Sequence, residues 1–172
     1  MNLDDDDFIL FGLPERFALD AALLDRRRRD LQSAAHPDRF AAQGAAAQRI
    51  AMQWSVRLNE AYQRLKDPLK RAAYLCERRG APVDAERNTA MPREFLMQQM
   101  AWREALDEAA DEPAVQSLAD QVEQHEHALL AEVAQLIDAR NDVAAAAAQV
   151  RALMFVARFR HDIDQRLAAL ER

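Results

Sequence analysis

The sequence has a single cysteine, Cys76, and this scarcity excludes several kinds of structure. One thiol cannot supply an intramolecular disulfide, a CxxC redox pair or the cysteine tetrad of a structural zinc site. Glycine and proline are also few, with 3 and 6 among 172 residues, and β-branched residues are uncommon, which argues against a β-sandwich or barrel. Alanine, leucine, glutamine, glutamate and arginine dominate instead, and these residues favour helices. The composition therefore predicts an all-α fold.

Long apolar runs are absent as well. No stretch of about 18 uncharged apolar residues is available to span a bilayer. The chain opens with Met-Asn-Leu-Asp-Asp-Asp-Asp rather than with a basic segment followed by an apolar one. We expect neither a membrane-spanning protein nor one secreted through such a segment. Together with the lone cysteine, this favours a reducing cytoplasm.

Signatures of catalysis are missing too. The sequence has no glycine-rich phosphate loop, no GxSxG motif and no ordered Ser/His/Asp set. His125 and His127 are two residues apart on an expected helix, so their side chains point about 160° apart and do not converge on a metal ion. We therefore expect no enzyme activity, no cofactor and no metal site.

Charge is divided unevenly along the chain. Residues 1–80 contain 14 lysines and arginines against 12 acidic residues, a net charge of +2, whereas residues 81–172 contain 9 against 17, a net charge of −8. Without the acidic run at 4–7, residues 8–80 have a net charge of +6. This division predicts two modules that face different partners. For the acidic run itself, the sequence leaves a functional segment and a solvated tail equally open.

Three helices are expected in the basic module. The first begins after the N-cap Asp20 and ends near His36, because Pro37 disfavours helical backbone in the residue before it. The second ends at Asp67-Pro68, and a short third helix covers 69–79. The apolar stripe of the second helix is formed by Ile50, Trp54, Leu58, Ala61 and Leu65.

A segment without helical spacing follows, and then an acidic module. Residues 81–92 contain two prolines and are interpreted as a linker. After it, helices are expected at about 93–111, 114–139 and 143–170. Their apolar residues recur at steps of three and four, which is typical of a left-handed bundle. Residues 93–172 are therefore predicted to form a three-helix bundle. The apolar stripe of the middle helix is formed by Val115, Leu118, Val122, Leu129, Val133 and Leu136.

The tripeptide His36-Pro37-Asp38 lies in the predicted loop between the first two helices. Proline restricts the backbone, so the histidine and aspartate are presented in a reproducible way at the tip of a helical hairpin. A purely structural alternative is that the proline stops one helix and the aspartate caps the next. The helix before the loop carries four arginines at 26–29, which are expected to form a basic strip that leads to the tripeptide.

Residues 8–80 resemble a J-domain, the module that stimulates the ATPase of DnaK-class chaperones. The resemblance is specific because the tripeptide, the basic helix before it and the segment 59–74 agree together. It implies that His36, Pro37 and Asp38 dock on the chaperone ATPase. It also implies that Arg28 and Arg29 support this contact as cations.

The basic helix departs from the J-domain pattern at two positions. An aromatic residue is often found just before the histidine, where this sequence has Ala35. A tyrosine or phenylalanine is often found where it has Arg28. The docking contacts of this helix are therefore expected to differ from those of other J-domains.

The helix expected from residue 93 has two apolar faces. Phe95 and Trp102 can fill the bundle core, whereas other residues project in a second direction. These other residues are Leu96, Met97, Met100, Glu104 and Glu108. A wide apolar stripe, or burial against the basic module, would explain the second face structurally. An apolar patch edged with acid and open to solvent would instead suit a basic partner.

The whole chain resembles the HscB family of iron–sulfur cluster co-chaperones, on the segments 8–14, 68–75 and 95–108. The resemblance implies that the second module binds the cluster scaffold protein, IscU. The implied binding residues are Leu96, Met97, Met100, Glu104, Glu108 and Phe155, the last of which falls outside the main stripe of its helix and is expected beside the patch. Ala101 stands where an acidic residue is often found, so some electrostatic contribution is expected to be lost. No N-terminal cysteine tetrad is present, which fits a bacterial type.

The expected function is that of a bacterial cytoplasmic co-chaperone. The resemblance implies that residues 1–80 stimulate the ATPase of the DnaK-class chaperone HscA, and that the bundle delivers IscU to it, most simply as a monomer. A generic J-domain adaptor for another client is the alternative. Nucleic-acid binding through the arginines at 26–29 is a third hypothesis, but a sequence pI of about 5.3 disfavours it.

Overall fold

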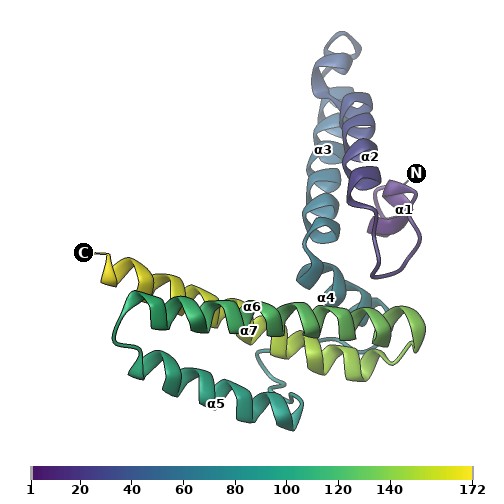
Figure 1. Ribbon diagram of the computed structural model, residues 1–172. Coiled ribbons are helices and arrows are strands. Elements are labelled where there is room, and N and C mark those ends of the chain that lie inside the picture. The colour runs from purple at the N-terminus through teal and green to yellow at the C-terminus, as the bar shows by residue number, and fades with distance from the viewer. Residues whose placement is uncertain (1, 172) are drawn as a thin grey trace. The chain divides into compact units, whose positions relative to one another are not determined.

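The computed structural model describes residues 2–171, which form helices and no β-strand (Figure 1). The all-α prediction is confirmed. The chain divides into two compact units, Met1–Leu75 and Cys76–Arg172, and each is described by itself. Within residues 2–171, every helix is too short or too polar to cross a membrane.

The first unit is a helical hairpin with short helices near its base. Helices α2 and α3 run antiparallel side by side, the 3-10 helix η1 forms the tip, and α1 lies beside the end away from the tip (Figure 1). A further helix, α4, begins directly after α3, and its last three residues belong to the second unit. The bounds are Asp7–Phe11 for α1, Ala21–Ala35 for α2, Pro37–Gln43 for η1, Ala45–Lys66 for α3 and Pro68–Arg78 for α4.

The ends of these helices follow the local signals in the sequence. Asp20 is the N-cap of α2, and its carboxylate accepts a hydrogen bond of 3.0 Å from the backbone N–H of Leu23. His36 follows α2 with extended backbone, as expected for a residue before proline. Asp67 ends α3, and its carboxylate accepts from the backbone N–H of Leu69 at 2.8 Å, which starts α4. The predicted ends of the first two helices are therefore confirmed, whereas α4 begins one residue before its predicted start and α1 was not predicted as a helix.

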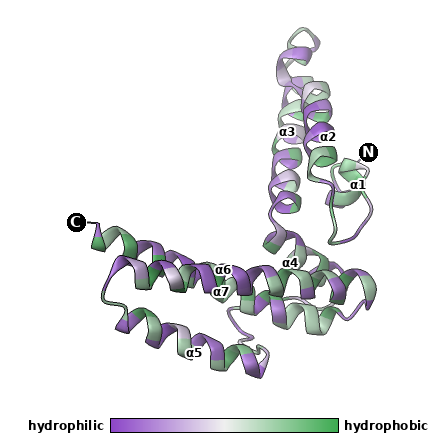
Figure 2. Cartoon of the chain, in the orientation of Figure 1, coloured by the Kyte–Doolittle hydropathy of each residue, from purple (hydrophilic) through white to green (hydrophobic). Residues whose placement is uncertain are grey.

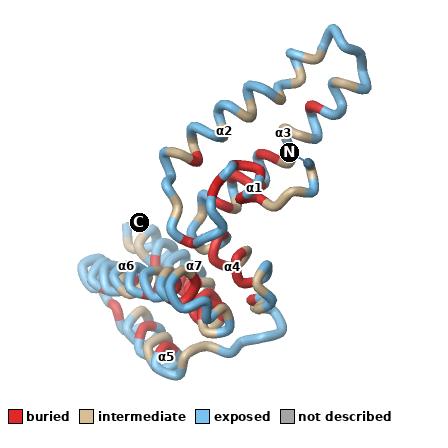
Figure 3. Tube along the Cα trace, turned by 90° about the vertical axis from the view of Figure 1, so that its right-hand side faces the viewer, coloured by how far each residue is buried: buried red, intermediate tan, exposed pale blue. Residues whose placement is uncertain are grey.

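The core of the first unit is concentrated at the base of the hairpin, where α1 covers it (Figure 3). Its fully buried residues include Phe8, Phe11, Leu24, Leu58 and Leu65. The prediction that Ile50 belongs to the buried stripe is wrong, because this side chain is 55% exposed. Toward the tip, α3 packs against α2 and against η1, which has no buried residue. The described residues of the first unit give little cover there to a position of α3 that faces away from both.

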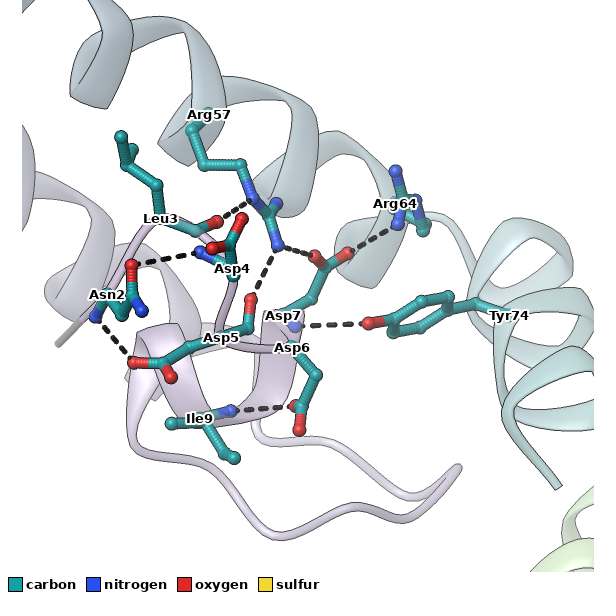
Figure 4. Close-up of polar contacts among 10 residues, drawn as sticks. All are labelled: Asn2, Leu3, Asp4, Asp5, Asp6, Asp7, Ile9, Arg57, Arg64 and Tyr74. Carbon is teal, nitrogen blue, oxygen red and sulfur yellow. Dashed lines mark hydrogen bonds and ion pairs between the residues drawn. The ribbon is translucent and has the colours of Figure 1, made fainter.

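The acidic run at 4–7 is partly built into this unit (Figure 4). The Asp7 side chain is completely buried, and its two carboxylate oxygens lie 2.8 Å from Arg57 Nη2 and 3.2 Å from Arg64 Nη1. The backbone N–H of Asp7 donates to the Tyr74 hydroxyl at 3.1 Å. Both arginines belong to α3 and Tyr74 belongs to α4, so the last residue of the run joins three helices.

The second unit contains three helices that lie alongside one another (Figure 1). They are α5 (Arg93–Glu108), α6 (Glu112–Ala134), which continues into the π-helical turn η2 (Gln135–Ala139), and α7 (Val143–Leu170). Helix α6 begins two residues before the predicted start, because Asp111 caps it and Pro113 is tolerated in its first turn. The predicted apolar stripe of the middle helix is buried. Helix α5 contains hydrophobic and hydrophilic residues interspersed along its length (Figure 2).

Residues 81–92 contain no helix, but they do not stand between the units. They belong to the second unit, together with residues 76–80. Arg151, which is buried on α7, donates from Nε to the Ala90 carbonyl at 2.6 Å and from Nη1 to the Val83 carbonyl at 2.9 Å. The structural division therefore differs from the predicted boundaries at 80 and 92, because one buried side chain binds the intervening segment to the bundle.

Candidate partner-binding surfaces

The tip of the hairpin holds the tripeptide in a defined turn. Pro37 begins η1, and the preceding residue His36 acts as its N-cap. The backbone N–H of Asp38 donates to His36 Nδ1 at 3.3 Å. A neutral His36 ring therefore carries its hydrogen on Nε2. Arg39 closes the turn by donating from Nη1 to the Ser33 carbonyl in the last turn of α2, at 3.1 Å.

Both polar side chains of the tripeptide are open to solvent. The side chain of His36 is 58% exposed and that of Asp38 is 90% exposed, and His36 Nδ1 lies 3.5 Å from Asp38 Oδ2. The turn is therefore ordered by short-range contacts, while its side chains stay available to a partner. The hydrogen bond from Arg39 to the Ser33 carbonyl was not predicted from the sequence. The presence of an arginine directly after the tripeptide could have indicated it.

Helix α2 carries four consecutive arginines, at 26–29, about two to three turns before the tip. Arg26 and Arg29 are exposed, whereas Arg28 is half-buried and its guanidinium lies 4.1 Å from the centre of the Tyr62 ring on α3. Arg28 and Arg29 line a surface cleft of about 390 Å³ together with Tyr62. The two predicted cations are therefore brought to one place, with Arg28 held by a cation–π contact.

Tyr62 connects this cleft to other charged groups. Its hydroxyl donates to Asp25 Oδ1 at 2.8 Å and accepts from Lys66 Nζ at 2.8 Å. The hydrogen bond with Tyr62 is the main cause that raises the pKa of Lys66, so this side chain keeps its positive charge. The sequence reasoning did not single out Tyr62 or Lys66, because their spacing is also that of a helix with one buried and one solvated face.

The second candidate surface is the outward face of α5. Leu96 is 39% exposed and Met97 and Met100 are each 65% exposed. Glu104 and Glu108 are exposed farther along the same helix. We call these five residues the α5 patch. Apolar side chains and carboxylates therefore share one accessible surface, as the helical spacing requires.

The opposite face of α5 is anchored by aromatic side chains. Phe95 and Trp102 are each 3% exposed, and their ring centres lie 6.0 Å apart in an edge-to-face arrangement. The Trp102 ring also stacks on Phe159 of α7 at 5.9 Å and meets the edge of His125 of α6 at 5.1 Å. These contacts hold α5 against both neighbouring helices and fix which face is left outside.

Phe155, predicted as a neighbour of the patch, is buried and contacts α5 from within the bundle. Its side chain is only 7% exposed. Its ring centre lies 5.7 Å from that of Phe95, and the guanidinium of Arg103 lies 5.2 Å from its centre. Phe155 falls outside the stripe that α7 turns toward α6, but α5 covers this position. Phe155 therefore packs beneath α5 and adds little exposed area to the patch.

The histidines of α6 have no common ligand geometry. His125 packs between Phe95 and Trp102, while His127 is exposed. Across residues 2–171, no three histidine, cysteine, aspartate or glutamate side chains gather as a possible metal site.

Comparison with known proteins gives matches over nearly the whole chain. Residues 91–164 match the family model described as HSCB C-terminal oligomerisation domain. A co-chaperone protein HscB homolog of Bordetella avium is 49% identical over 97% of this chain and 98% of its own length.

Solved structures share the fold as well. The chaperone HscB from Vibrio cholerae is 35% identical, with a TM-score of 0.82 over 96% of this chain and 99% of its own. The crystal structure of human co-chaperone protein HscB is 25% identical, with a TM-score of 0.85 over 96% of this chain and 83% of its own. The structural similarity therefore extends over both units and is not limited to the helical hairpin.

Proposed function

Because this chain belongs to the HscB family of co-chaperones, we propose that it stimulates the ATPase of the DnaK-class chaperone HscA and delivers the scaffold protein IscU to it. The proposed role is in iron–sulfur cluster assembly in the bacterial cytoplasm. The observation that carries the proposal is the exposure of both candidate surfaces, the tip of the hairpin and the α5 patch. The cluster is the cargo of the scaffold in this scheme.

The tip has the properties that a chaperone-docking element needs. His36, Pro37 and Asp38 are held by backbone geometry and short contacts, so little conformational entropy is lost when a partner binds them. Arg28 and Arg29 add positive charge on the adjoining helix. Stimulation follows if these groups bind the hydrolysis-competent state of the chaperone more tightly than its other states. The hydrolytic chemistry then belongs to the chaperone.

The α5 patch has the properties of a scaffold-binding surface. Leu96, Met97 and Met100 offer apolar area, and methionine adapts to irregular surfaces. Glu104 and Glu108 favour a basic partner. Phe155 takes part as a positioning residue beneath α5. Because both surfaces are on one chain, a bound scaffold is presented to the chaperone at a raised effective concentration.

The first experiment tests the tip by replacing His36→Gln and measuring the steady-state ATPase rate of HscA. We expect stimulation to be lost while scaffold binding is kept. His127→Gln is the matched control, because His127 is also exposed but lies on α6. Full stimulation by the His36→Gln variant would contradict the proposed role of the tripeptide.

The second experiment tests the α5 patch with the double variant Leu96→Ala and Met100→Ala. Each truncation removes apolar area worth about 1 kcal/mol or more when buried, so IscU should bind at least tenfold more weakly by calorimetry. The control is Met52→Ala with Val56→Ala, which truncates two exposed apolar residues on α3. If HscA is stimulated but IscU does not bind the unaltered chain, the protein is an adaptor for another client.

The oligomeric state has its own measurement. The sequence favours a monomer, whereas the description of the matched family domain names oligomerisation. We propose a monomer as the working form. Sedimentation equilibrium of the full chain at micromolar concentration checks this, and a dimer mass would overturn it.

A further inference from the structure

The acidic side of the α5 patch extends beyond the two glutamates assigned to it. We propose that Asp107 is a specificity-determining residue of this surface, where its carboxylate binds a lysine or arginine of the scaffold protein. This inference rests on the proposed function.

Asp107 projects in nearly the same direction as Met100. Residues of an α-helix are separated by 100°, so Asp107, seven positions after Met100, lies only about 20° from it around the axis. Glu108 lies about 80° from Met100 by the same geometry. Asp107 is exposed and belongs to α5. It therefore continues the line of the apolar residues more directly than Glu108 does.

Among the described residues, 2–171, no cation forms an ion pair with the Asp107 carboxylate. Arg103 is four residues before Asp107, but its guanidinium lies over the Phe155 ring, 5.2 Å from the centre. Arg166 of α7 reaches the end of α5, where its Nη2 donates to the Ala109 carbonyl at 3.0 Å. Within residues 2–171, Asp107 makes no ion pair with either of them. Its charge is thus available to a partner.

A carboxylate at position 107 is also unfavourable for α5 itself. The last turn of α5 contains no basic residue. Carboxylates at this end oppose the helix dipole, and Asp107 and Glu104, three residues apart, also repel each other. Residues that break a local rule without an internal compensation are expected at functional sites. The compensation here is a cation from outside the protein.

These observations also specify the partner's chemistry. The apolar residues precede the carboxylates along α5, so the matching surface has apolar groups followed by a cation. Residues 81–172 have a net charge of −8, which attracts a basic protein over a longer range. A basic group of the scaffold that reaches Asp107 would thus be selected over a neutral one.

The experiment uses the full chain with the substitution Asp107→Asn, which keeps the shape and removes the charge. We expect IscU to bind about three- to tenfold more weakly, mainly through a slower association rate, and the salt dependence of binding to become shallower. Asp107→Glu should keep most of the affinity. The matched control is Asp164→Asn on α7, which removes an exposed charge elsewhere in the same unit and should leave binding unchanged.

Thermal stability separates this role from a structural one. Asp107→Asn relieves repulsion within α5, so the melting temperature should stay equal or rise, whereas loss of a structural contact would lower it. Unchanged affinity of Asp107→Asn, alongside weakened binding by the Leu96→Ala and Met100→Ala variant, would overturn the inference and leave the proposed function intact. If the unaltered chain does not bind IscU, both are wrong.

Discussion

Asp7 is buried, although an acidic run near a chain terminus usually indicates exposed side chains. Its carboxylate is fully buried between Arg57 and Arg64, and removing a charge from water in this way is unfavourable unless partners compensate. The two arginines compensate the charge, and Tyr74 accepts a hydrogen bond from the backbone N–H of Asp7. Removal of the carboxylate would leave two cations facing each other.

We predict that Asp7→Asn destabilises the protein through the first unit. We expect the free energy of unfolding to fall by about 3 kcal/mol. This is the lower end of the range for breaking a buried ion pair, because the Arg64 side chain is 40% exposed. Urea unfolding followed by circular dichroism measures it. Asp4→Asn is the control, since Asp4 is exposed, and it should change stability by less than about 0.5 kcal/mol. Equal decreases in the free energy of unfolding of the two variants would show that the buried ion pairs of Asp7 do not stabilise the protein.

Cys76 allows a prediction about pH. Burial raises the pKa of its thiol from 9.0 to about 11, against the opposing effect of Arg79 and Arg151. Below pH 9 the thiol is protonated in both the folded and unfolded states. Between pH 9 and about 11 only the unfolded state loses the proton, so this thiol makes the protein less stable as pH rises.

The measurement is the urea midpoint at pH 8 and at pH 10.5, for the unaltered chain and for Cys76→Ala. We expect the decline with pH to be steeper in the unaltered chain, because the variant has no thiol to titrate. The native thiol should also react slowly with a disulfide reagent at pH 8. Identical pH dependence of the two proteins would be incompatible with a buried, titrating thiol.

At the scale of the elements, the ends of α2 were predictable from the sequence, whereas the burial of individual side chains was not. Asp20 and Pro37 act on their own neighbours, so local sequence determines where α2 begins and ends. The exposure of Ile50 and the burial of Phe155 depend instead on which other helix covers a position. A helical wheel gives a direction around one axis, but it does not show that α5 packs over Phe155 of α7 or that the side chain of Ile50 on α3 is left exposed.

The burial of Phe155 against α5 can be tested by truncating its side chain. We predict that Phe155→Ala destabilises the bundle by about 3–5 kcal/mol, because it leaves a cavity beneath α5, and that it weakens scaffold binding as a result. Phe155→Leu, which fills most of the space, should largely restore both. Chemical denaturation and calorimetry measure the two effects. A Phe155→Leu variant that is stable but still binds weakly would mean that the ring contacts the scaffold directly.

At the scale of the whole molecule, the main surprise for sequence reasoning is the segment 81–92. Its prolines and its lack of helical spacing predict a linker, and the absence of helix is correct. The sequence does not show that Arg151, some 60 positions later, donates to the carbonyls of Val83 and Ala90. Such a contact has no local signal, because an arginine on a helix usually faces solvent.

We predict that Arg151→Met loosens this segment. Trypsin should then cleave faster after Arg87, which is exposed within it, because the two carbonyls lose their donor. Limited proteolysis followed by mass spectrometry measures the cleavage rate. Arg158→Met is the matched control, as an exposed arginine on the same helix. Equal cleavage rates in the two variants would mean that Arg151 does not restrain the segment.

The uneven packing of the hairpin has a consequence for hydrogen exchange along the chain. Because η1 contains no buried residue, whereas Leu58 and Leu65 at the base are fully enclosed, backbone amides of residues 38–43 should take up deuterium early and those near the base late. The fast-exchanging stretch is also the one assigned to chaperone docking. A bound chaperone would therefore slow deuterium uptake where it is fastest in the free protein, and would locate its own footprint without a mutation.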